Sequence, residues 1–219
     1  MMTTLTASDG HELDCWIENP SGDSKGGLVI LQEIFGVTDQ LKGLARRYAA
    51  LDYTVAVPAL FDRQQRGAVI PFDAAAPGRD LMLASDPART LLDIAAAVDA
   101  LAAGGSKVAV MGFCWGGGLA IRAAQKLDIA GAVSFYGTRL PQYLDCPLKA
   151  PVLGHFGSRD DHVPPEMLQQ AKDYLPGLQV HMYDTGHAFA NDARPAMYDR
   201  ASAELAHERT TKFLAERLG

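Results

Sequence analysis

The chain of 219 residues is 48% hydrophobic and 21% charged, and its formal net charge is −6. This composition is that of an ordinary folded domain, which excludes extensive disorder, and the length suits a single α/β domain. The negative charge and the lack of any long run of Lys or Arg argue against nucleic acid as a partner.

The elements predicted along the chain alternate between strands and helices. Residues 12–18 alternate apolar and polar side chains, which predicts a half-buried edge strand, and short apolar runs predict buried strands further on. Those strands are expected at 27–31, 53–58, 107–111, 131–136, 151–157 and 178–183, and helices at 38–51, 87–103, after Cys114, after Pro164-Pro165 and at 195–218. This alternation predicts one α/β domain over residues 1–219, with a mostly parallel sheet and helices on both faces. Residues 61–86 interrupt the pattern and predict an irregular, functional loop.

The first residues, the longest apolar runs and the cysteines indicate where the protein is located and whether it contains disulfides. The first residues are short and polar, without the basic region and apolar stretch of a secretory signal. No apolar run approaches the roughly 18 residues that a membrane helix needs. Cys15, Cys114 and Cys146 are an odd number of cysteines and predict no disulfide framework. We therefore expect a soluble, cytoplasmic protein without a membrane partner.

The first motif that carries chemistry is Gly112-Phe113-Cys114-Trp115-Gly116-Gly117, where a predicted strand gives way to a helix. A sharp turn of this kind requires small residues two positions before and after the nucleophile, because larger side chains would collide with neighbouring backbone. A helix N-terminus favours negative charge, so Cys114 is the candidate nucleophile. The alternatives are a glycine-rich turn with a buried thiol, or a dinucleotide-binding loop, whose Gly-x-Gly opening is missing.

Two later motifs follow predicted strands at the same edge of the sheet. Asp160 and Asp161 precede Val163-Pro164, where such a pair, taken alone, more often caps a helix or lies in a solvated turn. His187 lies between the last predicted strand and the last helix. Cys114, Asp160 and His187 have the chain order nucleophile, acid, base of α/β-hydrolases, and we interpret them as a catalytic triad. The remaining histidines are expected to be structural or solvated: His11, His155, His162, His181 and His207.

A fourth motif, Gln32-Glu33-Ile34-Phe35-Gly36, ends the predicted strand 27–31. In α/β-hydrolases a backbone N–H at this point supplies one oxyanion donor, and we expect the N–H groups of Ile34 and Trp115 to form that hole. By its position alone, Glu33 is equally a solvated loop residue.

Together these motifs resemble the dienelactone hydrolase (carboxymethylenebutenolidase) family. The resemblance covers nearly the whole chain, in residues 32–37, 112–117 and 135–137, in Asp160 with Val163-Pro164, and in residues 186–190. It implies a single α/β-hydrolase domain that acts on a small ester or lactone without a metal or organic cofactor. The family reaction opens an unsaturated γ-lactone that bears a carboxymethylene group.

The resemblance also implies roles for individual residues. Cys114, His187 and Asp160 would form a Cys-His-Asp triad, with Asp161 as the acid if the alignment shifts by one residue. Glu33 would bond to the resting thiol and help its deprotonation. The residues implied in substrate binding are Phe35, Tyr136, Arg79 with Arg66 as the lesser candidate, and Asn191, which stands where the family has a carboxylate-binding arginine.

Other functions stay open at this point. One is a broad carboxylesterase with a different physiological substrate, and another is a non-catalytic protein that binds a small ligand on the same scaffold. A metal hydrolase built on Asp160, Asp161, His162 and His187 is a third, although these residues lack a recognised ligand spacing. We expect a monomer.

Overall fold

The structure, a computed structural model, describes residues 1–219 and has an α/β fold. The strand order is β1-β2-β4-β3-β5-β6-β7-β8. The strands are β1 (Met2–Thr6), β2 (Glu12–Glu18), β3 (Gly27–Leu31), β4 (Thr54–Pro58), β5 (Val108–Phe113), β6 (Gly131–Phe135), β7 (Val152–Gly157) and β8 (Leu178–Tyr183). The helices are α1 (Asp39–Ala49), α2 (Ala75–Ala84), α3 (Pro87–Ala102), α4 (Trp115–Lys126), α5 (Pro165–Tyr174) and α6 (Arg200–Leu218), with a short 3₁₀ helix at Leu140–Tyr143.

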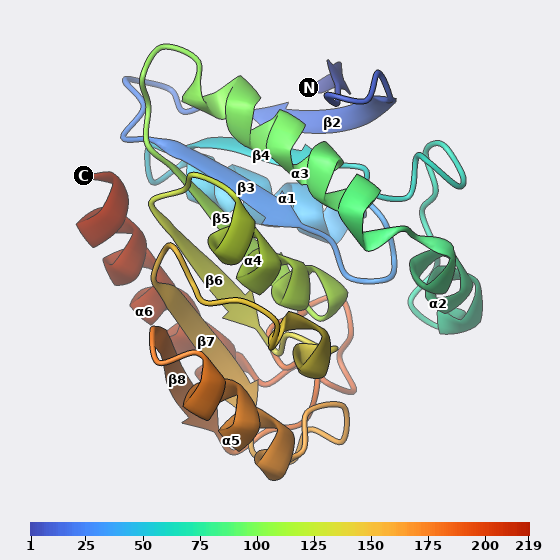
Figure 1. Cartoon of the computed structure of the whole chain (residues 1–219), viewed down its shortest axis with the longest axis vertical. Coiled ribbons are helices and arrows are strands. Elements are labelled where there is room, and N and C mark those ends of the chain that lie inside the picture. The colour runs from blue at the N-terminus through green and yellow to red at the C-terminus, as the bar shows by residue number, and fades with distance from the viewer. The chain divides into compact units, whose positions relative to one another are not determined.

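Contacts divide the chain into two compact units. The N-terminal unit comprises Met1–Ala109 with Leu218, and the C-terminal unit comprises Val110–Arg217 with Gly219. In the N-terminal unit β3 and β4 are parallel, whereas β2 is antiparallel both to β4 and to β1. α3 and α1 cover opposite faces of these strands (Figure 1). All of β3 is buried, as expected of an apolar strand between two layers of helices.

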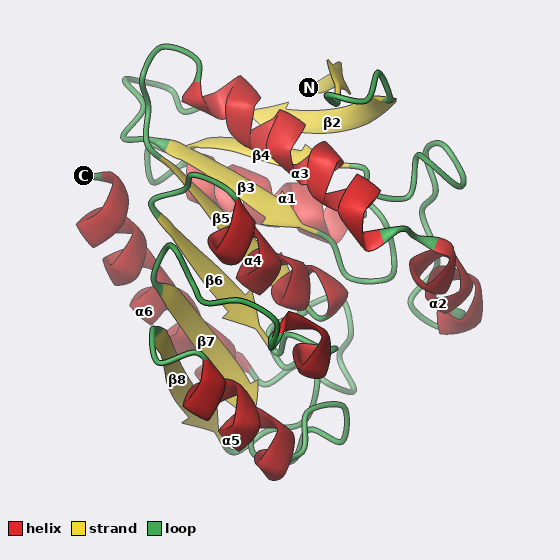
Figure 2. Cartoon of the chain, in the orientation of Figure 1, coloured by secondary structure: helices red, strands yellow, loops and turns green.

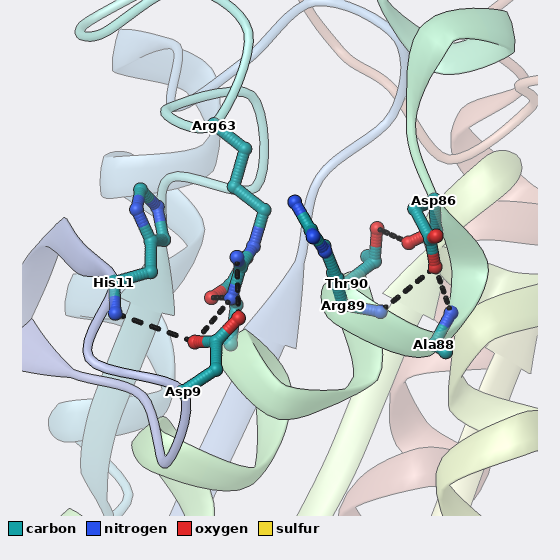
Figure 3. Close-up of polar contacts among 8 residues, drawn as sticks. Asp9, His11, Arg63, Asp86, Ala88, Arg89 and Thr90 are labelled. Atoms are coloured by element: carbon teal, nitrogen blue, oxygen red, sulfur yellow. Dashed lines mark hydrogen bonds and ion pairs between the residues drawn. The ribbon is translucent and has the colours of Figure 1, made fainter.

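An ion-pair cluster fastens the β1–β2 turn of the N-terminal unit. Arg63 Nη1 lies 2.8 Å from Asp9 Oδ2, and its Nη2 lies 2.7 Å from Oδ1 of Asp93, a buried residue of α3. Figure 3 shows Arg63 meeting Asp9 and, beside them, Asp86 at the start of α3. The Asp86 carboxylate accepts hydrogen bonds from Ala88 N–H and Arg89 N–H, so it caps this helix.

The C-terminal unit has β6, β7 and β8 in parallel, so their carboxyl ends lie at one edge. α4 and α5 cover one face of these strands, and α6 the other (Figure 1).

A buried chain of hydrogen bonds connects β7, β8 and α6. Arg209 Nη1 donates to Tyr183 Oη at 3.0 Å, and His155 contacts Tyr183 Oη at 2.8 Å and Thr210 Oγ1 at 3.0 Å. Because the Thr210 hydroxyl donates to Ala206 O, His155 Nε2 is the donor toward Thr210 and its Nδ1 accepts from Tyr183.

The predicted α/β architecture and mostly parallel sheet are confirmed, with three corrections. The strand predicted at residues 12–18 is not an edge strand, because the unpredicted strand β1 pairs with its outer side. The loop predicted at residues 61–86 contains a helix, α2 (Figure 2). The last helix begins at Arg200 rather than at residue 195, because the Asp199 carboxylate caps it by accepting from Ser202 N–H. None of the helices combines the length and the apolar character needed to cross a membrane.

Candidate active site

Cys114 occupies the turn between β5 and α4, with φ 52° and ψ −115°. Such a conformation is rare for a residue with a Cβ and costs on the order of 1–3 kcal/mol, so the surrounding structure must hold it. Gly112 makes the turn possible, because a Cβ at this position would lie 2.0 Å from Gly116 O. Backbone hydrogen bonds then fix the turn: Cys114 N–H donates to Phe135 O, and Cys114 O accepts from Thr138 N–H, both at 3.0 Å.

Asp160 follows β7 and is buried. Both of its carboxylate oxygens accept hydrogen bonds: Oδ1 from His162 N–H at 2.9 Å, and Oδ2 from His187 Nδ1 at 2.8 Å. Asp161 is exposed. Of the two carboxylates proposed from the sequence, Asp160 is therefore the one that contacts His187.

His187 follows β8 and is nine-tenths buried. Its ring bonds to Asp160 through Nδ1 and also makes a side-chain hydrogen bond with Cys114. Burial lowers the pKa of His187, but the hydrogen bonds to Asp160 and Cys114 outweigh it and raise this pKa to about 10. Sulfur, imidazole and carboxylate thus form one hydrogen-bonded line within the C-terminal unit. Trp115, which follows Cys114, is the first residue of α4 and is buried.

Two further rings pack against the His187 imidazole. The ring centroid of Tyr136 lies 5.1 Å away at 65°, and that of His162 lies 4.5 Å away at 57°. Tyr136 is fully buried and was predicted to lie at the site. The packing of His162 on His187 was not predicted. His162 was grouped with His187 only in the metal-hydrolase alternative, on its distance of two residues from Asp160, and was otherwise expected to be structural or solvated.

A cavity of about 320 Å³ opens beside His187. Its walls are Arg159 from the loop after β7, residues 185–187 after β8, and residues 196–199 before α6. These segments are loops that follow parallel strands at one edge of the unit (Figure 2). Cys114 is not among the residues that line it, so this cavity does not contain the candidate nucleophile.

The residues of the fourth predicted motif lie in the N-terminal unit. Glu33 is buried directly after β3, Ile34 is half-buried, and Phe35 is buried with its ring 4.8 Å from that of Phe72. α2 packs closely on this segment, because a Cβ on Gly78 would lie 1.8 Å from Ile34 O.

The three candidate carboxylate-binding residues have different surroundings. Arg79 is exposed on α2, and no ion pair occupies its side chain. Arg66 forms an ion pair with Asp14 of β2. Asn191 is buried, and its Oδ1 accepts from Ala193 N–H at 3.1 Å, a contact within its own turn.

The structure contains no group of three or more His, Cys, Asp or Glu side chains arranged to hold a metal ion. The metal-hydrolase alternative was built on Asp160, Asp161, His162 and His187. Both carboxylate oxygens of Asp160 already accept hydrogen bonds from the last two residues. The donor set therefore does not favour the metal-hydrolase alternative.

Comparison with known proteins shows the family of this chain. A model of the dienelactone hydrolase family matches residues 13–218. The chain belongs to this family. It is 31% identical to the carboxymethylenebutenolidase of Pseudomonas putida, over 97% of this chain and 94% of that protein. It is 28% identical to carboxymethylenebutenolidase 1 of Cupriavidus pinatubonensis, over 96% of this chain and 94% of that protein.

Solved structures share the fold of this family member. A dienelactone hydrolase-like promiscuous phosphotriesterase from metagenomic libraries has a TM-score of 0.84 at 23% identity, covering 100% of this chain and 99% of that one. The Pyrococcus furiosus esterase Pf2001 has a TM-score of 0.75 at 16% identity, covering 100% of this chain and 93% of that one. At these identities the likeness concerns the fold alone.

Proposed function

We propose that this family member hydrolyses a small ester or lactone through the thiol of Cys114. The observation that carries the proposal is the hydrogen-bonded line from Cys114 through His187 to Asp160. A thiol activated by an adjacent imidazole, whose other nitrogen is held by a carboxylate, is the arrangement of a nucleophilic triad.

In the first half-reaction His187 accepts the Cys114 proton and the sulfur attacks the substrate carbonyl carbon. A C–S bond forms and the carbonyl oxygen becomes an oxyanion, for which the N–H groups of Trp115 and Ile34 are the proposed donors. When the oxyanion collapses, the C–O bond to the leaving group breaks and His187 returns its proton to the departing oxygen. A thioester on Cys114 remains.

In the second half-reaction His187 takes a proton from water, and the resulting hydroxide attacks the thioester carbonyl. The C–S bond breaks, the carboxylic acid leaves, and the proton on His187 restores the resting pair with the sulfur. Asp160 keeps Nδ1 of the imidazole protonated throughout and stabilises its cationic form. Glu33 enters this scheme as a residue that assists deprotonation of the thiol, on the family resemblance alone.

The substrate class is inferred from the family. The carboxymethylenebutenolidases among the relatives suggest a dienelactone. One observation favours the alternative, a broad carboxylesterase: Arg66 is engaged by Asp14, and Asn191 carries no charge, so Arg79 alone is left to hold a substrate carboxylate. Comparing turnover of a dienelactone with that of neutral aryl esters distinguishes the two.

Replacing the nucleophile tests the proposal. Cys114→Ala should lower kcat for p-nitrophenyl acetate or a dienelactone by about 10⁴-fold or more, because no thioester forms. Mass spectrometry of the wild-type enzyme, quenched during turnover, should detect one acyl group on Cys114. Cys146→Ala is the matched control, since this half-exposed thiol lies beside Arg122 and not in the triad. Full activity of Cys114→Ala would refute the proposal, as would a protein that binds esters without hydrolysing them.

Alkylation adds a test of the thiol itself. Iodoacetamide at pH 7 should inactivate the enzyme and label Cys114 first. The thiolate is the reactive form, and His187 promotes it by accepting the proton of the Cys114 thiol. Cys15 should stay unlabelled, since it is fully buried and burial raises the pKa of its thiol to about 12. Labelling of Cys146 ahead of Cys114 would contradict the assignment.

A further inference from the structure

We propose that His162 is a positioning residue for the catalytic imidazole, a role that rests on the proposed function of His187 as base. The ring of His162 packs against that of His187 with centroids 4.5 Å apart. Among the histidines outside the triad, it makes a contact that bears directly on the reacting group.

The base requires such a support because of its own torsional freedom. In the resting enzyme the ring bonds both to Asp160 and to Cys114, but the bond to Cys114 is lost when the sulfur is acylated, and the torsion between Cβ and the ring of a histidine has a broad minimum. Packing by neighbouring groups must then fix the direction of Nε2. Tyr136 and His162 supply that packing, with ring planes at 65° and 57° to the imidazole.

The two rings differ in how they are held. Tyr136 is fully buried after β6, and its N–H donates to His155 O at 2.7 Å, so its backbone is fixed. His162 is exposed, but its N–H donates to Asp160 Oδ1 at 2.9 Å. One residue thus contacts both partners of the acid–base pair: its backbone bonds to the acid, and its ring packs on the base.

Because the backbone of His162 bonds to Asp160 and its ring packs on His187, the two contacts can be tested separately. A side-chain substitution removes the ring contact and leaves the backbone bond to Asp160 in place. His162→Ala should lower kcat for ester hydrolysis about tenfold while KM changes less than twofold, since a displaced base slows the chemical step and not binding. His162→Phe keeps an aromatic ring at this position and should restore kcat to within about threefold of wild type.

His181→Ala is the matched control. This half-buried histidine of β8 stacks on His155, with ring centroids 5.9 Å apart, and should retain wild-type kcat. The melting temperature of each variant separates positioning from stability: a purely structural role would lower the melting temperature of His162→Ala while kcat at 25 °C stayed unchanged.

Three outcomes are decisive. A tenfold loss in His162→Ala that Phe reverses supports the proposal. Wild-type kcat in His162→Ala overturns it, and so does a His162→Phe variant as slow as Ala. The proposed function fails separately, when Cys114→Ala retains activity in the same assay.

Discussion

The acid of the site is distinguished from its neighbour by two hydrogen bonds. Asp160 is buried and accepts from His162 N–H and from His187, whereas the adjacent Asp161 is exposed. From the sequence alone either carboxylate could be the acid, because a shift of one residue in the alignment to the family exchanges Asp160 and Asp161. Burial separates them, because a buried carboxylate must be satisfied by donors and an exposed one is satisfied by water.

The pair Asp160→Asn and Asp161→Asn tests this assignment. Asn at position 160 carries no charge to stabilise the cationic His187, and its amide can orient the imidazole in the wrong tautomer. We expect kcat for ester hydrolysis to fall on the order of 10²- to 10⁴-fold in Asp160→Asn and to stay within twofold in Asp161→Asn. Steady-state kinetics on both proteins measure this, and a greater loss in the second variant would assign the acid to Asp161.

At the scale of elements, α2 is held on the N-terminal unit by a backbone contact and by little apolar packing. Gly78 is its buried residue, and a Cβ there would lie 1.8 Å from Ile34 O. A carbonyl oxygen in a tight turn has little room to move, so α2 must shift if a methyl group is added. The position of α2 is thus coupled to the segment that follows β3.

Gly78→Ala and Gly43→Ala form a matched pair on two helices of this unit. Gly78→Ala should lower the free energy of unfolding by about 1–3 kcal/mol through overpacking. Gly43→Ala in α1 should raise it by up to about 1 kcal/mol, because a Cβ there meets nothing within 4 Å and alanine favours the helix. Urea unfolding measures both changes. Equal effects of the two substitutions would mean that α2 is not held by this contact.

The sequence predicted those elements whose pattern is decided locally. The strand of residues 27–31 is a continuous apolar run, and Pro87 after Asp86 marks the start of α3. β1 was missed because its residues, Met2–Thr6, have no sustained apolar pattern and become a strand by pairing with β2. α2 was missed because it buries almost no side chain, so no helical stripe appears in its sequence.

In the candidate site, too, the features decided by local sequence were predictable, and those decided by contacts in space were harder to predict. Gly112 and Cys114 were predictable, because the sharp turn leaves a local spacing of glycines in the sequence. The bond between Asp160 and His187, 27 residues apart, was predictable only from the chain order of the motifs. The packing of His162 on His187 depends on the path of two loops in space, which no periodicity records.

For the whole molecule, two histidines of the C-terminal unit make stability depend on pH in opposite directions. The pKa of His187 is raised to about 10, in part by its hydrogen bond to Cys114 and by the charge of that residue. The proton on the imidazole is the one that the thiol gives up in the proposed pair, and an unfolded chain keeps that proton on a free thiol up to about pH 8.5. The native state therefore holds an extra proton only between about pH 8.5 and 10, and the contribution of the pair is lost as the pH rises through that window.

Burial lowers the pKa of His155 well below 6.5, and the positive charges of nearby groups such as Arg209 act in the same direction. Its Nδ1 accepts from Tyr183, so a proton on that nitrogen would break the buried chain of hydrogen bonds. Below about pH 6.5 the unfolded chain binds a proton that native His155 does not, and stability falls as the pH falls. His181, whose pKa is also lowered by burial, adds to the same limb.

The free energy of unfolding should therefore fall below about pH 6.5 and again above about pH 8.5. His187→Gln should flatten the decline between pH 8.5 and 10, and His155→Asn should make the decline below pH 6.5 shallower even if it lowers stability overall. Urea unfolding of the three proteins at pH 5, 7.5 and 9.5 separates slope from level, because each histidine affects only the limb in which native and unfolded protonation differ. An alkaline limb that persists unchanged in His187→Gln would show that the imidazole at position 187 does not hold its proton through the hydrogen bonds to Asp160 and Cys114.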